Sequence, residues 1–378
     1  MKNPLLTNKV LLIIFFLVIT FLLIIMFKNA PEDKTPSNTY IEKKESVPLA
    51  TSTETNTSST TNIVATSTPN INTKKDNPSA VSTLPKSTWL WHYPTALNDS
   101  QMQEYINFLK NEQFDTVYID ITGYIDAYES PDPNAKKIFE NRLIKFVDLA
   151  HQSNIKVEGL VGGNMWAQPN YNYVPSIILD FVIEFNQQPE HAKLTGIQYD
   201  VESYNLPEFS NPDEQSIILT EYLTMVQTLT NKVASKSPNL RLGFAVPFWF
   251  DNYTRELPLI TFNKTENPVG FHVLDILQSI NNGYIVIMDY RNKTEGPNGS
   301  IALAKPQINY ATKYTSHVGV IIAQETTNVE PLSITFYNQP KTNLDKALEE
   351  IMKAFSYTKS LEGFAIHDID GYKELVKN

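Results

Sequence analysis

The sequence predicts an α/β fold, a (β/α)8 TIM barrel, for the part of the chain that follows residue 86. Eight short apolar runs are spaced along this part, and longer amphipathic segments separate them, which is the alternation of a parallel barrel. The length of this part, about 290 residues, is ordinary for such a barrel. A doubly wound sheet usually has fewer strands, so the closed barrel is the predicted architecture.

The expected strands are apolar runs of six to eight residues, rich in β-branched and aromatic side chains. They are TWLWHY (88–93), DTVYIDI (115–121), KVEGLVG (156–162), TGIQYDV (195–201), RLGFAVPF (241–248), GYIVIMDY (283–290), VGVIIAQ (318–324) and GFAIHD (363–368).

The segments between these strands repeat apolar residues every three or four positions, as amphipathic helices do. The first of them opens with Asp99 and Ser100, residue types that cap helix N-termini. We expect helices over 99–112, 135–153, 174–187, 214–235 and 343–357, weaker ones near 270–281 and 301–314, and a short last one in YKELVKN.

Residues 1–28 form an expected membrane anchor. The run Val10–Phe27 is apolar except for Thr20. At 1.5 Å per residue it is about 27 Å long as a helix, enough to cross a bilayer core of roughly 30 Å. Signal peptides have shorter apolar cores that end at small residues, whereas this run is followed by Lys28 and a poor cleavage sequence. We therefore expect an uncleaved transmembrane helix, with a cleaved signal peptide as the alternative.

The charges around the anchor predict its orientation. Lys2 and Lys9 precede the apolar run and Lys28 alone follows it closely, which favours an N-terminus inside and the rest of the chain outside. Residues 29–86 are rich in Ser, Thr and Asn and poor in large apolar side chains, so they are an expected disordered linker. The expected domains are thus the anchor, this linker and a barrel over 87–378, at the outer face of a cell membrane.

Composition excludes several classes of function. The chain has no cysteine, which rules out disulfides, thiolate zinc sites and a cysteine nucleophile. Its net charge of −10 argues against a nucleic-acid partner. It has no glycine-rich phosphate loop and no His-x-x-x-His pair, so we expect neither a cofactor nor a metal.

Polar side chains line one face of the fourth strand, in the stretch GIQYDVESY (196–204). Side chains alternate between the faces of a strand, so Gln198, Asp200 and Glu202 point the same way. A barrel of this kind carries its chemistry at the C-terminal ends of its strands. A glutamate beside apolar walls there has a raised pKa and can donate a proton, and Asp200 can hold it in place or share its proton. The alternative is a structural hydrogen-bond network that closes the barrel mouth.

The other strand ends also carry acids, carboxamides or large aromatic side chains. Aromatic faces pack against the C–H faces of sugar rings while acids and amides bind hydroxyls, so this pattern predicts a carbohydrate site, whereas Trp89 belongs to the core. The expected substrate-binding residues are Trp91, Asp120, Trp166, Gln198, Trp249, Asp289 and His367, and the expected catalytic residues are Asp200, Glu202, Tyr290 and Glu325.

The fourth strand resembles the signature of family 18 glycoside hydrolases, the chitinase-like barrels, which reads Asp-x-x-Asp-x-Asp-x-Glu. Here Thr195 and Gln198 replace the first two acids, whereas Asp200 and Glu202 match the last two. The resemblance implies that Glu202 is the general acid and that Asp200 orients an N-acetyl group of the substrate, which acts as the internal nucleophile. The family's sixth strand reads Met-x-Tyr-Asp, and the stretch 288–291 keeps its Met and Tyr but ends in Arg.

A second resemblance, to the clan of retaining barrel glycosidases, competes with the first. In that clan the acid/base glutamate ends strand four and a nucleophilic glutamate ends strand seven, which are the places of Glu202 and Glu325. The clan usually has Asn before the acid/base, where this chain has Val201. A retaining pair needs carboxyl groups about 5–5.5 Å apart, and an inverting pair about 6.5–9.5 Å.

These patterns together predict a membrane-anchored, extracytoplasmic glycoside hydrolase that acts on a cell-wall or extracellular polysaccharide or oligosaccharide. Two other classes stay open: a carbohydrate-binding barrel without catalysis, and a hydrolase or lyase of another extracellular substrate, since barrels host many chemistries. The sequence leaves the sugar, the linkage and the oligomeric state open.

Overall fold

The structure, a computed structural model, describes residues 84–377. The expected anchor, Val10–Phe27, and nearly all of the expected linker lie outside the described residues. Within 84–377 no helix combines the length and the apolar character that a bilayer crossing requires.

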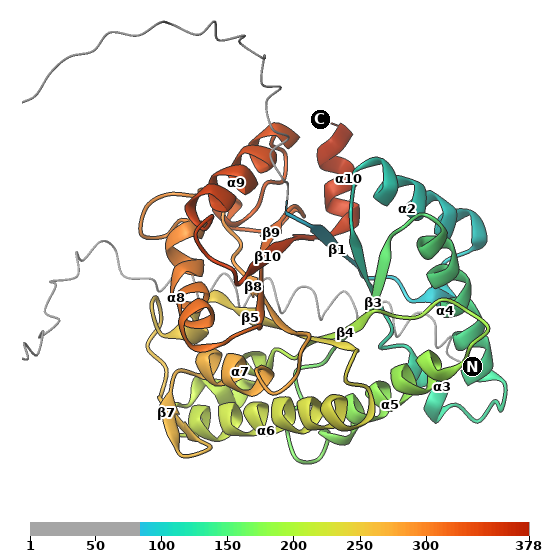
Figure 1. Cartoon of the computed structure of the whole chain (residues 1–378), viewed down its shortest axis with the longest axis horizontal. Helices are drawn as coiled ribbons and strands as arrows, with labels where there is room; N and C mark the ends of the chain where they lie inside the picture. The colour runs from blue at the N-terminus through green and yellow to red at the C-terminus, as the bar shows by residue number, and fades with distance from the viewer. Residues whose placement is uncertain (1–83, 378) are drawn as a thin grey trace, which may run out of the picture. The chain divides into compact units, whose positions relative to one another are not determined.

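Eight parallel strands close into a barrel, as Figure 1 shows, which confirms the predicted fold class. Along the barrel wall the order is β1-β10-β9-β8-β5-β4-β3-β2, and the pairing of β1 with β10 closes it. The strands are β1 (Lys86–Leu90), β2 (Thr116–Asp120), β3 (Lys156–Gly162), β4 (Gly196–Asp200), β5 (Arg241–Pro247), β8 (Gly283–Met288), β9 (Gly319–Glu325) and β10 (Leu361–His367).

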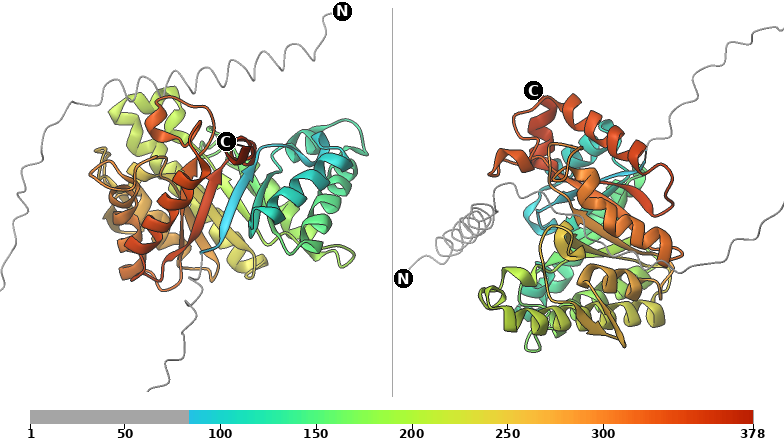
Figure 2. Two further views of the ribbon diagram at one scale, coloured as in Figure 1. Left: turned by 90° about the horizontal axis from the view of Figure 1, so that it is seen from above. Right: turned by 90° about the vertical axis from the view of Figure 1, so that its left-hand side faces the viewer.

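Helices cover the outside of the barrel, as the two further views in Figure 2 also show. They are α2 (Asp99–Asn111), α3 (Tyr124–Glu129), α4 (Ala135–Gln152), α5 (Tyr173–Gln187), α6 (Pro212–Lys236), α7 (Val269–Leu277), α8 (Ser300–Tyr314), α9 (Lys341–Ala354) and α10 (Ile369–Lys377). Five short 3-10 turns lie in the described loops: η1 (Pro94–Ala96), η2 (Ser203–Asn205), η3 (Pro207–Ser210), η4 (Phe248–Asp251) and η5 (Leu332–Ile334).

Several boundaries differ from the expectation. The strands expected over 88–93 and 283–290 end at Leu90 and Met288, so the polar residues after them lie in loops. The last helix starts at Ile369 and is longer than expected. The sequence did not predict α3 and the antiparallel hairpin of β6 (Ile260–Phe262) and β7 (Thr265–Asn267), because six- and three-residue elements are too short to show a period.

The apolar core has two layers. The larger layer lies between the strands and the surrounding helices, and side chains inside the barrel form the smaller one. The inner layer consists of Trp89, Tyr118, Leu160, Tyr284, Val286, Ile321, Ala323 and Ala365. Trp89 is therefore a core residue, as predicted. The barrel is a packed core rather than a pore, which leaves the C-terminal ends of its strands as the place for chemistry.

An ion pair closes the bottom of the barrel. Glu158 of β3 is buried, and its Oε1 lies 3.0 Å from Nε of Arg241 of β5. The hydroxyl of Tyr284 donates to Oε2 of Glu158 at 2.5 Å. Arg241 also reaches Glu362 at 3.2 Å. Because every charge here has a protein partner, we assign this network to stability rather than to substrate binding.

Candidate active site at the C-terminal mouth of the barrel

Glu202 lies directly after β4, and the residues that follow it fix its carboxylate. The chain turns there into η2, which carries Tyr204 and Asn205 back toward the glutamate. The Tyr204 hydroxyl donates to Oε1 of Glu202, and Asn205 Nδ2 donates to Oε2 at 2.8 Å. The side chain is only partly buried. Glu202 is thus held in one orientation within reach of solvent.

Asp200 and Glu202 form a coupled pair of acids. Burial is the main cause that raises the pKa of Asp200 well above its usual range, and the neighbouring Glu202 carboxylate adds to the rise. Burial also raises the pKa of Glu202, against the hydrogen bond from Tyr204 and the charge of His367. Asp200 Oδ1 has no hydrogen-bond partner among the described residues. Two acids so placed keep a proton to higher pH than isolated carboxyl groups, which favours general acid catalysis.

Glu325, at the end of β9, is buried and fully engaged by hydrogen bonds. Its Oε1 accepts from the backbone N–H of Thr326 at 2.8 Å and from the N–H and hydroxyl of Thr327 at 2.6 and 2.7 Å. Its Oε2 lies 2.8 Å from Nδ1 of His367. Burial alone would raise the pKa of Glu325, but His367 and the Thr327 hydrogen bonds lower it overall. A carboxylate with all these partners is poorly placed to attack a sugar.

His367, at the end of β10, is the cationic partner of this carboxylate. Burial opposes its charge, but Glu325, Asp368 and Asp200 raise the pKa of the imidazole to about 9. The positive charge of His367 in turn acts on Asp200 and Glu202. The mouth therefore contains an internal cation among several carboxyl groups.

Trp91 and Tyr290 flank His367. The Trp91 indole Nε1 lies 3.0 Å from Nε2 of the imidazole, and the Tyr290 ring centroid lies 5.8 Å from that of the imidazole. Burial and the charges of Glu325 and Asp200 raise the pKa of Tyr290 well above its usual range. Tyr290 therefore keeps its proton and can donate a hydrogen bond at the mouth.

Asp120 ends β2 beside this group. Its Oδ1 accepts from the backbone N–H of Thr122 at 2.8 Å, and burial raises its pKa to about 6. Behind it, His92 Nε2 pairs with Asp370 at 2.9 Å. Asp120 lies at the strand end that the sequence predicted, where Thr122 binds its carboxylate.

The three tryptophans expected at the site follow three different strands. Trp91 follows β1 and is 36% exposed. Trp166 follows β3, where its indole lies so close to Gly163 that a Cβ there would be 2.6 Å from Nε1. Trp249 belongs to η4 after β5 and packs edge-on against Tyr204, with ring centroids 5.0 Å apart. Each therefore lies at the same end of the barrel as Glu202.

Two residues expected to bind substrate are not at the surface of the mouth. Gln198 is 0% exposed inside the barrel, where it accepts from Trp89 Nε1 at 2.6 Å and donates to Tyr284 at 3.3 Å. Asp289 is also 0% exposed, and its backbone oxygen accepts from Gln324 at 2.9 Å. Gln198 belongs to a buried polar network, whereas both carboxylate oxygens of Asp289 are buried without a hydrogen-bond partner among the described residues. The burial of both side chains argues against direct substrate contact.

The sequence did not predict the hydrogen-bond partners of the acids, above all Tyr204, Asn205 and Thr327. A weak signal was available, since all three follow an acid by two or three residues, the spacing at which a turn folds a side chain back. Within 84–377 no group of three or more acids and histidines is arranged to hold a metal ion.

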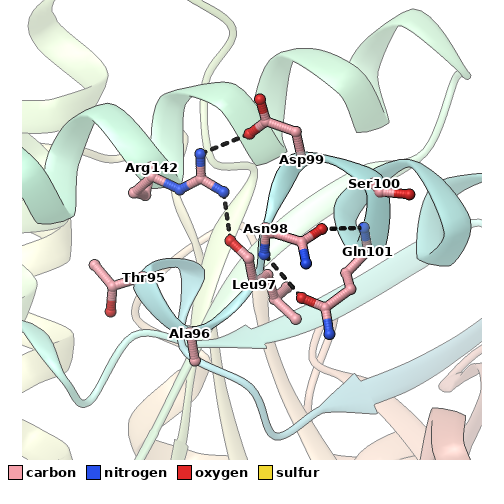
Figure 3. Close-up of a pocket in the computed structure, with 8 residues that line it drawn as sticks. All are labelled: Thr95, Ala96, Leu97, Asn98, Asp99, Ser100, Gln101 and Arg142. Carbon is pink, nitrogen blue, oxygen red and sulfur yellow. Dashed lines mark hydrogen bonds and ion pairs between the residues drawn. The ribbon is translucent and has the colours of Figure 1, made fainter.

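A depression outside the barrel, shown in Figure 3, carries polar groups that satisfy one another. Asn98 and Gln101 form the capping box of α2, each accepting a backbone N–H of the other at 2.9 Å. Arg142 pairs with Asp99 at 2.7 Å and donates to the backbone of Leu97. These groups stabilise the start of α2, and we assign no ligand to them.

No protein-family model matches the chain, and no curated protein matches its sequence. Solved structures match it in fold. A β-galactosidase from the psychrophilic Marinomonas ef1 matches with a TM-score of 0.50 at 10% identity, over 75% of this chain and 54% of that one. An exo-β-1,4-mannosidase from Opitutaceae bacterium strain TAV5 matches with 0.49 at 11%, over 76% and 52%. A GH18 chitinase from Pseudoalteromonas aurantia matches with 0.47 at 13%, over 77% and 96%.

The chain spans about half the length of the galactosidase and the mannosidase. At identities this low the likeness shows the fold alone. The strand pairing of the described residues shows the barrel, and its chemistry must be argued from its own side chains.

Proposed function

We propose that the chain is a membrane-anchored, extracytoplasmic glycoside hydrolase that acts on a cell-wall or extracellular glycan. The observation that supports this most is the Asp200–Glu202 pair, two coupled acids with raised pKa values at the C-terminal mouth of a barrel. The partly exposed tryptophans lie at the same end of the barrel as this pair, and the charges of both acids act on Tyr290. These rings and the Tyr290 hydroxyl would supply stacking faces and a hydrogen-bond donor for a sugar.

In the proposed reaction Glu202 donates its proton to the glycosidic oxygen as the bond to the anomeric carbon breaks. Glu325 is engaged with His367 and the Thr326–Thr327 turn, so we do not assign it the attack on the anomeric carbon. A neighbouring acylamino group on the sugar would supply the nucleophile, oriented by Asp200 and Tyr290. Water then adds to the anomeric carbon as the bond between this carbon and the acylamino oxygen breaks, and it returns a proton to Glu202, which completes the cycle.

The anchoring half of the proposal rests on the sequence. The apolar run Val10–Phe27 is long enough to span a bilayer, and the lysines around it favour an outer location for the barrel. The proposed catalytic domain starts at β1, whose first residue, Lys86, precedes the expected boundary by one position.

A glycan-binding barrel without turnover is the second candidate, and one observation favours it. Both oxygens of Glu202 accept side-chain hydrogen bonds, which stabilise its charged form and oppose its use as an acid. Incubation of the full chain with a panel of β-linked glycans, including N-acetylglucosamine polymers, separates the two. New reducing ends support hydrolysis, and retention of polymer without cleavage supports binding alone.

A further inference from the structure

Arg255 differs from the other arginines of the chain in what surrounds it. The sequence contains four arginines. Arg142 pairs with Asp99, Arg241 pairs with Glu158 and Glu362, and the charge of Asp289 acts on Arg291. Arg255 has no carboxylate within 4.0 Å among residues 84–377.

Aromatic rings surround the Arg255 guanidinium instead. It lies 4.5 Å from the centroid of the Trp249 ring and 5.5 Å from that of Phe209. Burial lowers the pKa of Arg255, and the charge of Tyr204 opposes this shift. A guanidinium stacked on rings keeps its N–H donors pointing along its own plane, where a planar or tetrahedral anion can bind two of them.

This guanidinium lies beside the proposed active site. Tyr204 donates to Glu202, its ring packs against Trp249 at 5.0 Å, and Trp249 carries Arg255 on its face. The rings of Tyr204 and Trp249, which contact each other, thus lie between Glu202 and the Arg255 guanidinium. A glycan whose glycosidic oxygen reaches Glu202 would bring a neighbouring sugar over Trp249.

We infer that Arg255 binds an anionic substituent of the substrate, a carboxylate or a phosphate, so that the glycan is acidic. This inference rests on the proposed function for the identity of the ligand as a glycan. In a chain with a net charge of −10, a cation without an acid partner beside the proposed site attracts a negative group that the chain as a whole repels. A purely structural role, stacking on Trp249, is the alternative to test.

The test is a titration of the full chain, labelled with ¹⁵N-arginine, in detergent micelles. Four arginines give four side-chain Nε–Hε signals, and Arg255→Lys identifies the one that belongs to Arg255. The probes are glucuronate, glucose 6-phosphate and the neutral methyl glucoside. The inference expects the Arg255 signal to shift with one or both anions and not with the neutral sugar, while Arg142 stays unchanged. The anion that shifts the Arg255 signal more identifies the substituent as a carboxylate or a phosphate.

Three results would overturn the inference: no shift with either anion, an equal shift with methyl glucoside, or equal shifts at Arg142 and Arg255. The readout does not depend on turnover, so Glu202→Gln must leave the Arg255 shift intact. A parent chain that hydrolyses no glycan but still shows the Arg255 shift would count against the proposed function alone. Hydrolysis of neutral glycans with no shift would count against this inference alone.

Once an acidic glycan that the chain cleaves is known, a kinetic measurement separates binding of its charged group by Arg255 from a structural role of this residue. Arg255→Gln should raise KM about tenfold or more on the acidic polymer, since hydrogen bonds to charged groups are worth about 1.5–3 kcal/mol. It should leave KM unchanged on the same polymer after reduction of its carboxyl groups. On the acidic polymer the KM of Arg255→Lys, which keeps the charge but lacks the forked guanidinium, should lie between that of the parent chain and that of Arg255→Gln. Equal effects on both polymers would show a structural role.

Discussion

The imidazole Nδ1 of His367 lies 2.8 Å from Oε2 of Glu325, and the two residues are register partners on the adjacent strands β10 and β9. The pairing of parallel strands thus brings an acid and a base together at the barrel mouth. The pair places the positive charge of His367 at the mouth, balanced by the Glu325 carboxylate, and removes Glu325 from the set of free carboxylates.

Replacing Glu325 by Gln should lower the pKa of His367 from about 9 toward its ordinary value, because the main charge that holds its proton is removed. The free energy of unfolding should fall by about 2–3 kcal/mol, since one partner of a mostly buried pair is left alone. NMR titration of the imidazole and urea unfolding measure the two effects. Glu349→Gln, on the exposed face of α9, is the control and should change neither.

This pair should also make stability depend on pH. The pKa of His367 is raised in the folded chain, so its contribution is complete below pH 6.5, the ordinary value, and is lost as the pH rises through about 9. The stability difference between the parent chain and Glu325→Gln should therefore shrink over this window. A difference that grows with pH would contradict the assignment.

Trp91 should respond to the same titration. An indole N–H only donates, so its 3.0 Å contact with Nε2 of His367 forms with the neutral imidazole, whereas the raised pKa makes the imidazolium the main form at neutral pH. Of the two states, we assign the imidazolium paired with Glu325 to neutral pH, because several hydrogen bonds fix that carboxylate. Tryptophan fluorescence should therefore change near pH 9 in the parent chain and not in Trp91→Phe. An unchanged signal would show that the indole stays in place.

Tyr204→Phe should shift the pH–rate profile toward higher pH. The Tyr204 hydroxyl donates to Glu202 and opposes the rise of its pKa, so its removal raises that pKa further. A general acid must be protonated, and activity falls as the pH passes its pKa, so the alkaline limb should shift to higher pH. The rate at the optimum should change by less than about tenfold. Asn205→Ala should shift the limb in the same direction, and a shift to lower pH in either variant would contradict the assignment.

The bottom of the barrel should depend on both of its charges. Arg241→Met leaves Glu158, only 2% exposed, as an unpaired acid, which should cost about 3–5 kcal/mol of unfolding free energy. Adding Glu158→Gln to this variant should recover part of the loss, because the uncompensated charge is gone. Urea unfolding of the single and double variants measures this. An additive further loss would show that packing rather than charge dominates there.

The sequence predicted the barrel well because strand burial is a local signal. Runs such as GYIVIM and GVIIAQ are buried on both sides and read as continuous apolar stretches, and all eight barrel strands were expected near their observed places. Short pieces such as α3 and the β6–β7 hairpin could not be predicted, since tertiary packing rather than periodicity determines them.

The sequence predicted which strand ends carry the site residues, but not which of their side chains contact one another. Alternation along β4 placed Asp200 and Glu202 together, and strand ends placed Glu325 and His367 at the same mouth. The pairing of Glu325 with His367 depends on register between β9 and β10, which a single sequence does not contain. The burial of Asp289 was missed because the observed strand ends at Met288 rather than at Tyr290, which is where the sequence had placed its end.

The central claim is that Glu202 donates the proton to the leaving group, and the leaving group itself tests it. Hydrolysis should be compared between a natural disaccharide linkage and a 2,4-dinitrophenyl glycoside of the same sugar, which leaves without protonation. Glu202→Gln should lose about 10²–10⁴-fold on the natural linkage and far less on the aryl glycoside, while Glu208→Gln in η3 should match the parent chain on both. Equal losses of Glu202→Gln on the two substrates, or no loss on the natural linkage, would contradict the account.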